Sequence, residues 1–90
     1  MNYSKMDVHC QRKIMEWQET KEDFPVSCLV SLSLGSRHNV SNVLTSKGID
    51  FSFSAGDIAS ISNIPISRLS EVADLQDVIK IELSRRLNLL

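Results

Sequence analysis

The sequence predicts a small α+β domain in the order strand, helix, strand, strand, helix, strand, preceded by one extra helix. Three observations support this prediction. Apolar residues alternate with polar ones in four short segments, apolar residues recur at helical spacing in the segments between them, and 90 residues suffice for one domain. We therefore divide the chain into a helical extension, residues 1–24, and a domain, residues 25–90.

The extension is predicted to be a helix over residues 4–21. Ser4 is the expected N-cap, with Asp7 three residues later, and Pro25 ends the segment because a residue before proline avoids the helical region. We expect the apolar stripe of this helix to pack on the domain or the helix to fray, and docking of the stripe on a partner is the alternative. The stripe consists of Met6, Cys10, Ile14 and Trp17.

The first strand is predicted over residues 25–34 and is followed by a helix over 37–47. Ser36 is the expected N-cap of that helix, and Gly48 is suited to end it in the left-handed conformation. The strand should turn one apolar side inward and leave the other, mostly serine, outside. The inward residues are Val26, Cys28, Val30, Leu32 and Leu34.

The next two strands, residues 49–54 and 58–64, are predicted to form a hairpin across the turn at Gly56. The second of them loses its alternation, and a β-bulge near Ser62 or Asn63 would restore it.

The last helix and strand follow Pro65. Ser67 is the expected cap of a helix whose apolar face reaches Leu75, and the final strand covers residues 77–83. Ile79, Ile81 and Leu83 are predicted to point to its inner side.

This order predicts a ferredoxin-like β-α-β-β-α-β fold, a four-stranded antiparallel sheet with two helices on one face. Most strand serines lie opposite the apolar stripes, so the other sheet face should be small, polar and flat. Such a face is usually only solvated. It is also the face that this fold would offer to a partner.

Charge and composition argue against several classes of function. The net charge is −1 with no basic stripe, so we expect neither nucleic acid nor a membrane as partner. The chain lacks a signal-peptide pattern and is expected in the cytoplasm, with Cys10 and Cys28 as free thiols. We find no motif for a metal, a cofactor or catalysis and expect no enzyme.

The segment after the last strand ends in apolar residues. It either folds back on the core or inserts as an extended peptide into a partner's groove, and the residues alone leave both readings open. The segment comprises Leu87, Asn88, Leu89 and Leu90.

Several short motifs together resemble the N-terminal prodomain of subtilisin-like serine proteases, over roughly residues 25–88. The order and spacing of the motifs carry the resemblance, and the N-terminal helix lies outside it. The motifs are KGIDF at 47–51, AGDIAS at 55–60, IPISRL at 64–69 and VIKIELSRRL at 78–87.

The resemblance implies a ferredoxin-like protein that inhibits its protease and helps it to fold. The sheet face would dock on two surface helices of the enzyme, and the tail would lie in the active-site cleft as a product does, with Leu90 and Leu87 in the first and fourth pockets. Glu82 would cap a helix of the protease. Arg85 and Arg86 stand where such prodomains commonly have further acidic residues, so this chain departs from the family pattern there.

We therefore expect a stand-alone, propeptide-like inhibitor of a subtilisin-like serine protease, of the inhibitor I9-like kind. The alternative is a ferredoxin-like interaction or oligomerisation module with no protease partner, using its serine face or the Met/Trp stripe of the first helix. The sequence leaves the target protease and the oligomeric state open.

Overall fold

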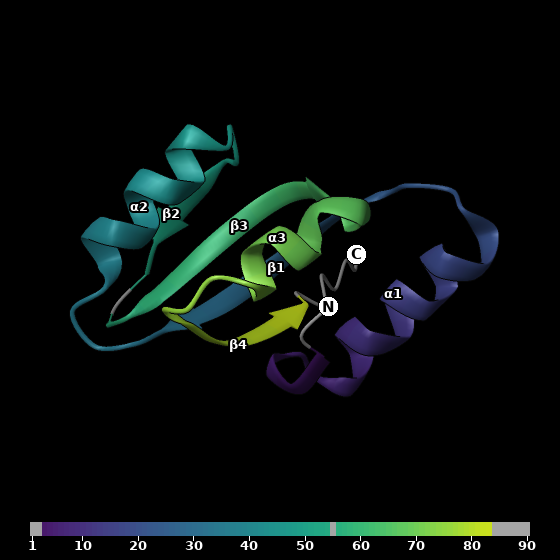
Figure 1. Ribbon diagram of the computed structural model, residues 1–90, viewed down its shortest axis with the longest axis horizontal. Helices are drawn as coiled ribbons and strands as arrows, with labels where there is room; N and C mark the ends of the chain where they lie inside the picture. Colours follow the sequence, from purple (N-terminus) through teal and green to yellow (C-terminus); the bar gives the residue numbers. More distant parts are fainter. Residues whose placement is uncertain (1–2, 55, 84–90) are drawn as a thin grey trace, which may run out of the picture.

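The chain forms an α+β structure around one four-stranded antiparallel sheet (Figure 1). The computed structural model describes residues 3–54 and 56–83. The strand order is β2-β3-β1-β4, and every neighbouring pair is antiparallel, so the predicted antiparallel sheet is confirmed. The strands are β1 (Pro25–Leu32), β2 (Phe51–Phe53), β3 (Ile58–Pro65) and β4 (Val78–Leu83).

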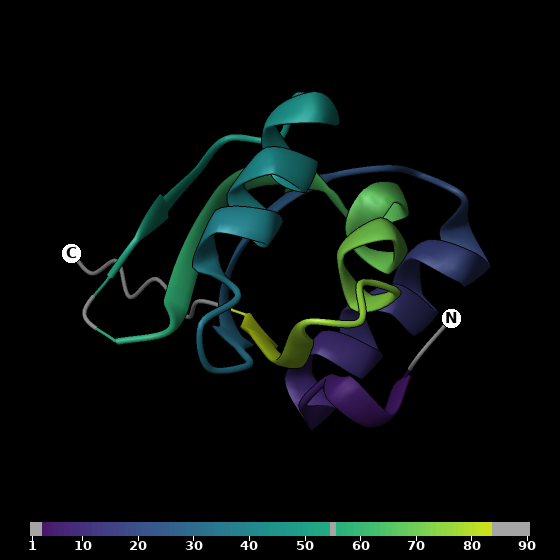
Figure 2. The same ribbon diagram turned by 60° about the vertical axis from the view of Figure 1, so that its left-hand side comes forward.

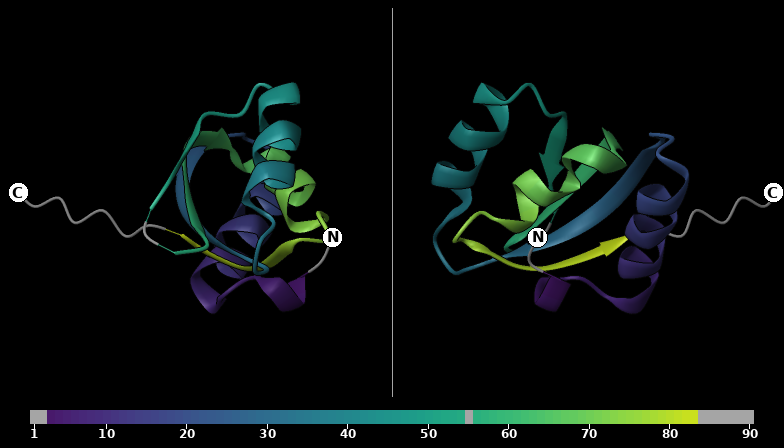
Figure 3. Two further views of the ribbon diagram at one scale, coloured as in Figure 1. Left: turned by 90° about the vertical axis from the view of Figure 1, so that its left-hand side faces the viewer. Right: turned by 45° about the vertical axis from the view of Figure 1, so that its right-hand side comes forward.

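The helices gather on one side of the curved sheet, as the edge-on view shows (Figure 3). Helix α3 lies between α2 and α1 (Figures 1 and 2). Short 3-10 turns precede α1 and α3, so each of these helices begins later than the sequence predicts. The helices are α1 (Val8–Thr20), α2 (Arg37–Ser46) and α3 (Leu69–Ala73), and the turns are η1 (Tyr3–Lys5) and η2 (Ile66–Arg68).

Helix α1 belongs to the same hydrophobic core as the strands. Cys10 and Ile14 are fully buried, Met6 is nearly so, and Trp17 packs partly buried against them. The prediction that the apolar stripe packs on the domain is therefore confirmed. In place of docking on a partner, the stripe covers β4 and η2, the elements with which α1 makes its main contacts.

The prediction that Ser4 caps the first helix is wrong. Asp7 is the N-cap, and its carboxylate accepts a hydrogen bond from the Cys10 N–H at 2.8 Å. The helix cannot begin earlier because Met6 forms a parallel bridge with Ile81, and the Asp7 N–H donates to the Ile81 carbonyl at 3.2 Å. The chain thus covers the outer edge of β4 before it turns into α1.

The bulge predicted in β3 is present. Val26 pairs with Ile64 but Cys28 pairs with Ile61, so β3 holds one extra residue between these pairs. Asn63 adopts a positive φ of 54° there, a conformation that asparagine tolerates better than most residues. The bulge brings Ile61 and Ile64 to the same buried side, which explains the broken alternation of the sequence.

A second irregularity, in β4, overturns the predicted inner face of that strand. Ser31 pairs with Lys80 but Leu32 pairs with Val78, so Ile79 has no partner in the β1–β4 register. Val78 is buried and Ile79 is 57% exposed, the reverse of the prediction. The inward positions of Ile81 and Leu83 are as predicted.

Two strands are shorter than predicted by two residues or more, and β4 is shorter by one. Strand β1 ends at Leu32, and Leu34, expected inside, is 93% exposed beyond its end. Strand β2 begins at Phe51, after the buried Ile49, which lies outside the strand. Gly48 has a φ of 70°, the left-handed conformation predicted for it.

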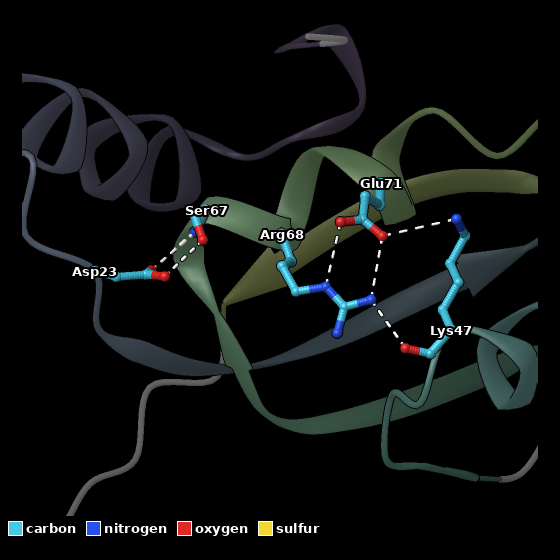
Figure 4. A network of polar contacts seen from close by, with 5 residues as sticks. All are labelled: Asp23, Lys47, Ser67, Arg68 and Glu71. Atoms are coloured by element: carbon cyan, nitrogen blue, oxygen red, sulfur yellow. Dashed lines mark hydrogen bonds and ion pairs between the residues drawn. The ribbon is translucent and has the colours of Figure 1, made fainter.

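Neither of the other two serines predicted as helix caps acts as one through its side chain. Ser36 is the N-cap residue of α2, but its hydroxyl donates to the Ser33 carbonyl at 2.7 Å. Ser67 lies inside η2, where its N–H and hydroxyl donate to the two carboxylate oxygens of Asp23 at 3.1 and 2.6 Å (Figure 4). These two bonds tie η2 to the segment that links α1 to β1, and they lower the pKa of Asp23.

Arg68 joins the start of α3 to the end of α2. Its guanidinium donates to both carboxylate oxygens of Glu71 at 3.2 Å and to the Lys47 carbonyl at 2.9 Å (Figure 4). Lys47 in turn lies 3.7 Å from the Glu71 carboxylate. The network therefore fixes two consecutive helices of the layer relative to each other.

Candidate protein-binding face

The side of the sheet turned away from the helices is the candidate site, and we call it the outer face. No helix among the described residues covers it (Figure 3). Its side chains come from all four strands, because alternate residues of a strand point to the same side. The outer face consists of Leu29, Ser31, Ser52, Ile58, Ser60, Lys80 and Glu82.

One cross-strand row runs through the whole width of the sheet. Ser52 pairs with Ser60, Ser60 with Leu29, and Leu29 with Glu82. Directly paired residues have their Cβ atoms about 5 Å apart. The row thus presents two hydroxyls, one apolar side chain and one carboxylate along a line across β2, β3, β1 and β4.

A second row lies beside it and adds an apolar and a basic group. Ser31 pairs with Ile58 on one side and with Lys80 on the other. Leu29 and Ile58 are 42% and 37% exposed, so both retain apolar area that water contacts. The outer face is accordingly a mixed surface of small hydroxyls with two apolar side chains, close to the flat serine face expected from the sequence.

Glu82 lies on this face and is engaged in an ion pair. The Lys80 amine lies 2.9 Å from Oε2 of Glu82, and this hydrogen bond raises the pKa of Lys80 above its usual value. About half of each side chain is exposed, which keeps the pair accessible to a partner. A carboxylate can accept several hydrogen bonds at once, so the pairing leaves Glu82 capable of a further contact.

The two phenylalanines of β2 lie on the other side of the sheet. Phe51 and Phe53 pack against the core with their rings 5.5 Å apart in an edge-to-face arrangement. The Arg37 guanidinium lies 4.5 Å from the centre of the Phe53 ring. They therefore add no aromatic group to the outer face.

Both cysteines are free thiols within the core. Cys10 and Cys28 are fully buried, and burial raises the pKa of each thiol to about 12. A thiol with such a pKa is neutral and unreactive at ordinary pH. No group of three or more histidines, cysteines or carboxylates with metal-binding geometry occurs within the described ranges.

The sequence pointed to two kinds of binding residue, and the structure places only one of them. Glu82 is on the outer face, next to Leu29. Residues Leu87 to Leu90 lie outside the described residues. The sequence did not predict that Ile58 is exposed on the outer face. The apolar–polar alternation of β3 is interrupted at the bulge, so the pattern did not decide which side of the sheet Ile58 faces.

Comparison with known proteins adds no relative: no protein-family model, curated protein or solved structure matches the chain. The resemblance to subtilase prodomains therefore stays a prediction. Across the part of the chain that the structure describes, no helix has the length and apolar character that a membrane crossing requires.

Proposed function

We propose that the protein is a propeptide-like inhibitor of a subtilisin-like serine protease and that its outer face docks on the enzyme. The observation that carries the proposal is the uncovered row Ser52, Ser60, Leu29 and Glu82 across the sheet. Small serines let helices of a partner approach a sheet closely, and the exposed part of Leu29 gives them apolar area to bury. The motif resemblance supplies the class of partner.

We also propose that the fold is ferredoxin-like, the fold that subtilase prodomains share. The strand order supports this. Strand β3 lies between β1 and β2, and β1 lies between β3 and β4. Each strand–helix–strand unit is thus split by a strand of the other unit, which is the arrangement typical of split β-α-β folds.

Glu82 supports the proposal through its chemistry. A carboxylate on a flat face is suited to the N-terminus of a partner helix, where the helix dipole and unpaired N–H groups favour negative charge. Binding in this way requires Glu82 to share or exchange its contact with Lys80. The tail from Leu87 to Leu90 is proposed to block the active-site cleft of the protease.

The direct test is inhibition of a panel of purified subtilisin-like proteases by the full chain. We expect inhibition of at least one enzyme at a defined stoichiometry. Deleting Leu87–Leu90 should weaken that inhibition greatly while leaving the fold intact. Unchanged inhibition by the shortened chain would contradict the tail mechanism, and no inhibition across the panel would reject the proposal as a whole.

A matched pair of leucines tests the face separately. Leu29→Asp places a charge on the outer face and should weaken inhibition by about tenfold or more, since a buried unpaired charge is costly. Leu34→Asp is the control, because Leu34 is 93% exposed beyond the end of β1. Equal effects of the two substitutions would exclude the outer face as the docking surface.

The oligomerisation module remains a second candidate because Leu29 and Ile58 expose apolar area on one face. Light scattering distinguishes the two functions. A concentration-dependent dimer that Leu29→Asp abolishes, together with no inhibition of any protease, would favour self-association.

A further inference from the structure

A pocket of about 330 Å³ opens between α1 and one end of the sheet, away from the centre of the outer face. It lies where β1 begins and where β3 and β4 end, so three adjacent strands and one helix contribute to it. Its volume is at the lower limit of known small-molecule sites. The lining residues are His9, Lys13, Phe24, Pro25, Val26, Ser27, Asn63 and Leu83.

The apolar part of the lining comes from the strand ends. Phe24 and Val26 are half-buried and pack against the core, and Leu83 is mostly buried. These side chains can take up a short apolar group, such as a branched aliphatic chain, and remove its surface from water.

The polar part of the lining supplies hydrogen-bond donors beside these apolar side chains. His9 and Lys13 are four residues apart, so they lie on the same side of α1. The β3 bulge brings Asn63 beside Ser27, whose hydroxyl oxygen accepts the Asn63 N–H at 3.4 Å. That contact leaves the Ser27 hydroxyl proton for another acceptor.

The described side chains that line the pocket include a basic group but no acidic one. Lys13 contributes the positive charge. Glu16 on the same helix lies 3.9 Å from the Lys13 amine, at the limit of an ion pair, and both side chains are partly exposed. An amine with three donors can therefore bind a second anion.

We propose that this pocket binds a carboxylate that carries a short apolar group. The carboxylate would contact Lys13 and the Ser27 hydroxyl, and the apolar group would lie on Phe24, Val26 and Leu83. Two sources share this chemistry, a free small carboxylic acid and the C-terminal residue of a peptide. The site is separate from the protease inhibition proposed above and does not depend on it.

Three small probes separate the sources and test the charge. 4-Methylpentanoate is a free acid, N-acetyl-leucine imitates the end of a peptide, and N-acetyl-leucinamide has the same apolar group without the carboxylate. Binding to the full chain is followed by amide chemical shifts of Lys13, Ser27 and Asn63. Residues 84–90 follow Leu83 directly, so the full chain is used and any competition by them is included in the measurement.

We expect saturable shifts with both carboxylates and dissociation constants of order 1 mM, typical of ligands of this size. N-acetyl-leucinamide should bind at least about tenfold more weakly. Tighter binding of N-acetyl-leucine than of 4-methylpentanoate identifies a peptide end as the source, and equal binding identifies the free acid. Shifts of equal size with the amide, or no saturable shift with any probe, would overturn the proposal.

Two neighbouring residues provide controls for Lys13. Lys13→Gln should weaken binding of N-acetyl-leucine about three- to tenfold, since the amine is partly exposed. Glu16→Gln breaks the same ion pair but keeps the amine, so binding should stay equal or become tighter. Arg12→Gln removes an exposed charge that does not line the pocket and should change nothing. A loss of binding in Glu16→Gln or Arg12→Gln equal to that in Lys13→Gln would reject the assigned contact.

Discussion

The two faces of the sheet differ in how far their apolar residues are buried. On the inner face Val30, Ile61 and Ile81 are almost completely excluded from water by the helices. On the outer face Leu29 and Ile58, in the same strands, keep about two fifths of their surface exposed. Packing therefore constrains the inner residues tightly, while it constrains the partly exposed outer residues less.

The largest expected effect compares two isoleucines of β3. Ile61→Ala should lower the free energy of unfolding by about 2–5 kcal/mol, since it removes a fully buried side chain and leaves a cavity. Ile58→Ala removes the same atoms from the outer face and should cost less than about 1 kcal/mol. Urea denaturation followed by circular dichroism measures both.

The same pair separates stability from binding. If the outer face docks on a protease, Ile58→Ala should weaken inhibition of the protease while changing the free energy of unfolding little. Equal losses of stability from the two substitutions would mean that the faces do not differ as described.

The next effect concerns the thiols of the inner side. Burial raises the folded-state pKa of Cys10 and Cys28 from 9.0 to about 12, so the unfolded chain releases these protons first. Stability is therefore complete below about pH 9 and falls as the pH rises from there to about 12. The expected loss is roughly 1 to 2 kcal/mol for each thiol at pH 10.

Urea denaturation at several pH values between 8 and 11 checks this slope. The Cys10→Ala/Cys28→Ala variant provides the control because it lacks both groups. It should lose about 3 kcal/mol less than the native chain between pH 8 and pH 10. Parallel curves for the two proteins would contradict the burial of the thiols.

A smaller effect is expected at the bulge of β3. Asn63 has a φ of 54°, a region that costs most side chains about 1 kcal/mol or more and glycine little. Asn63→Ala should therefore lower the free energy of unfolding by about 1 kcal/mol, while Asn63→Gly should stay within about 0.5 kcal/mol. If alanine were tolerated as well as glycine, the left-handed conformation would be excluded.

The two bulges show how far the sequence alone could predict this fold. In β3 the apolar residues Ile58, Ile61 and Ile64 break the alternation, so the sequence itself indicates an extra residue. In β4 the pattern around Ile79 reads as regular alternation, and only pairing of Leu32 with Val78 turns Ile79 outward. Register between strands distant in sequence is a tertiary property, and the local pattern does not contain it.

For the same reason, the sequence predicted the serines of the outer face but did not predict the pocket beside α1. The serines of the outer face were predictable because they alternate with core residues along β1 and β2. The pocket beside α1 was not, since it needs His9 and Lys13 to approach Ser27 and Asn63. Ser4 was predicted as the helix cap by spacing alone. Because Met6 forms a bridge with Ile81, the helix begins only at Val8, with Asp7 as its N-cap.

The smallest expected effect concerns the ion pair on the outer face. Hydrogen bonding to Glu82 raises the pKa of Lys80 in the folded chain above the unfolded pKa of 10.5. The stability that Lys80 contributes is therefore present below pH 10.5, and it is lost as the pH rises through the folded-state pKa. Glu82→Gln should bring the Lys80 pKa, measured by NMR titration of its side chain, back toward 10.5. Because both side chains are half-exposed, the urea midpoint at pH 7 should not change measurably. A clear loss of stability would show that this pair helps to hold the sheet together, and the outer face would then share the structural role of the inner one.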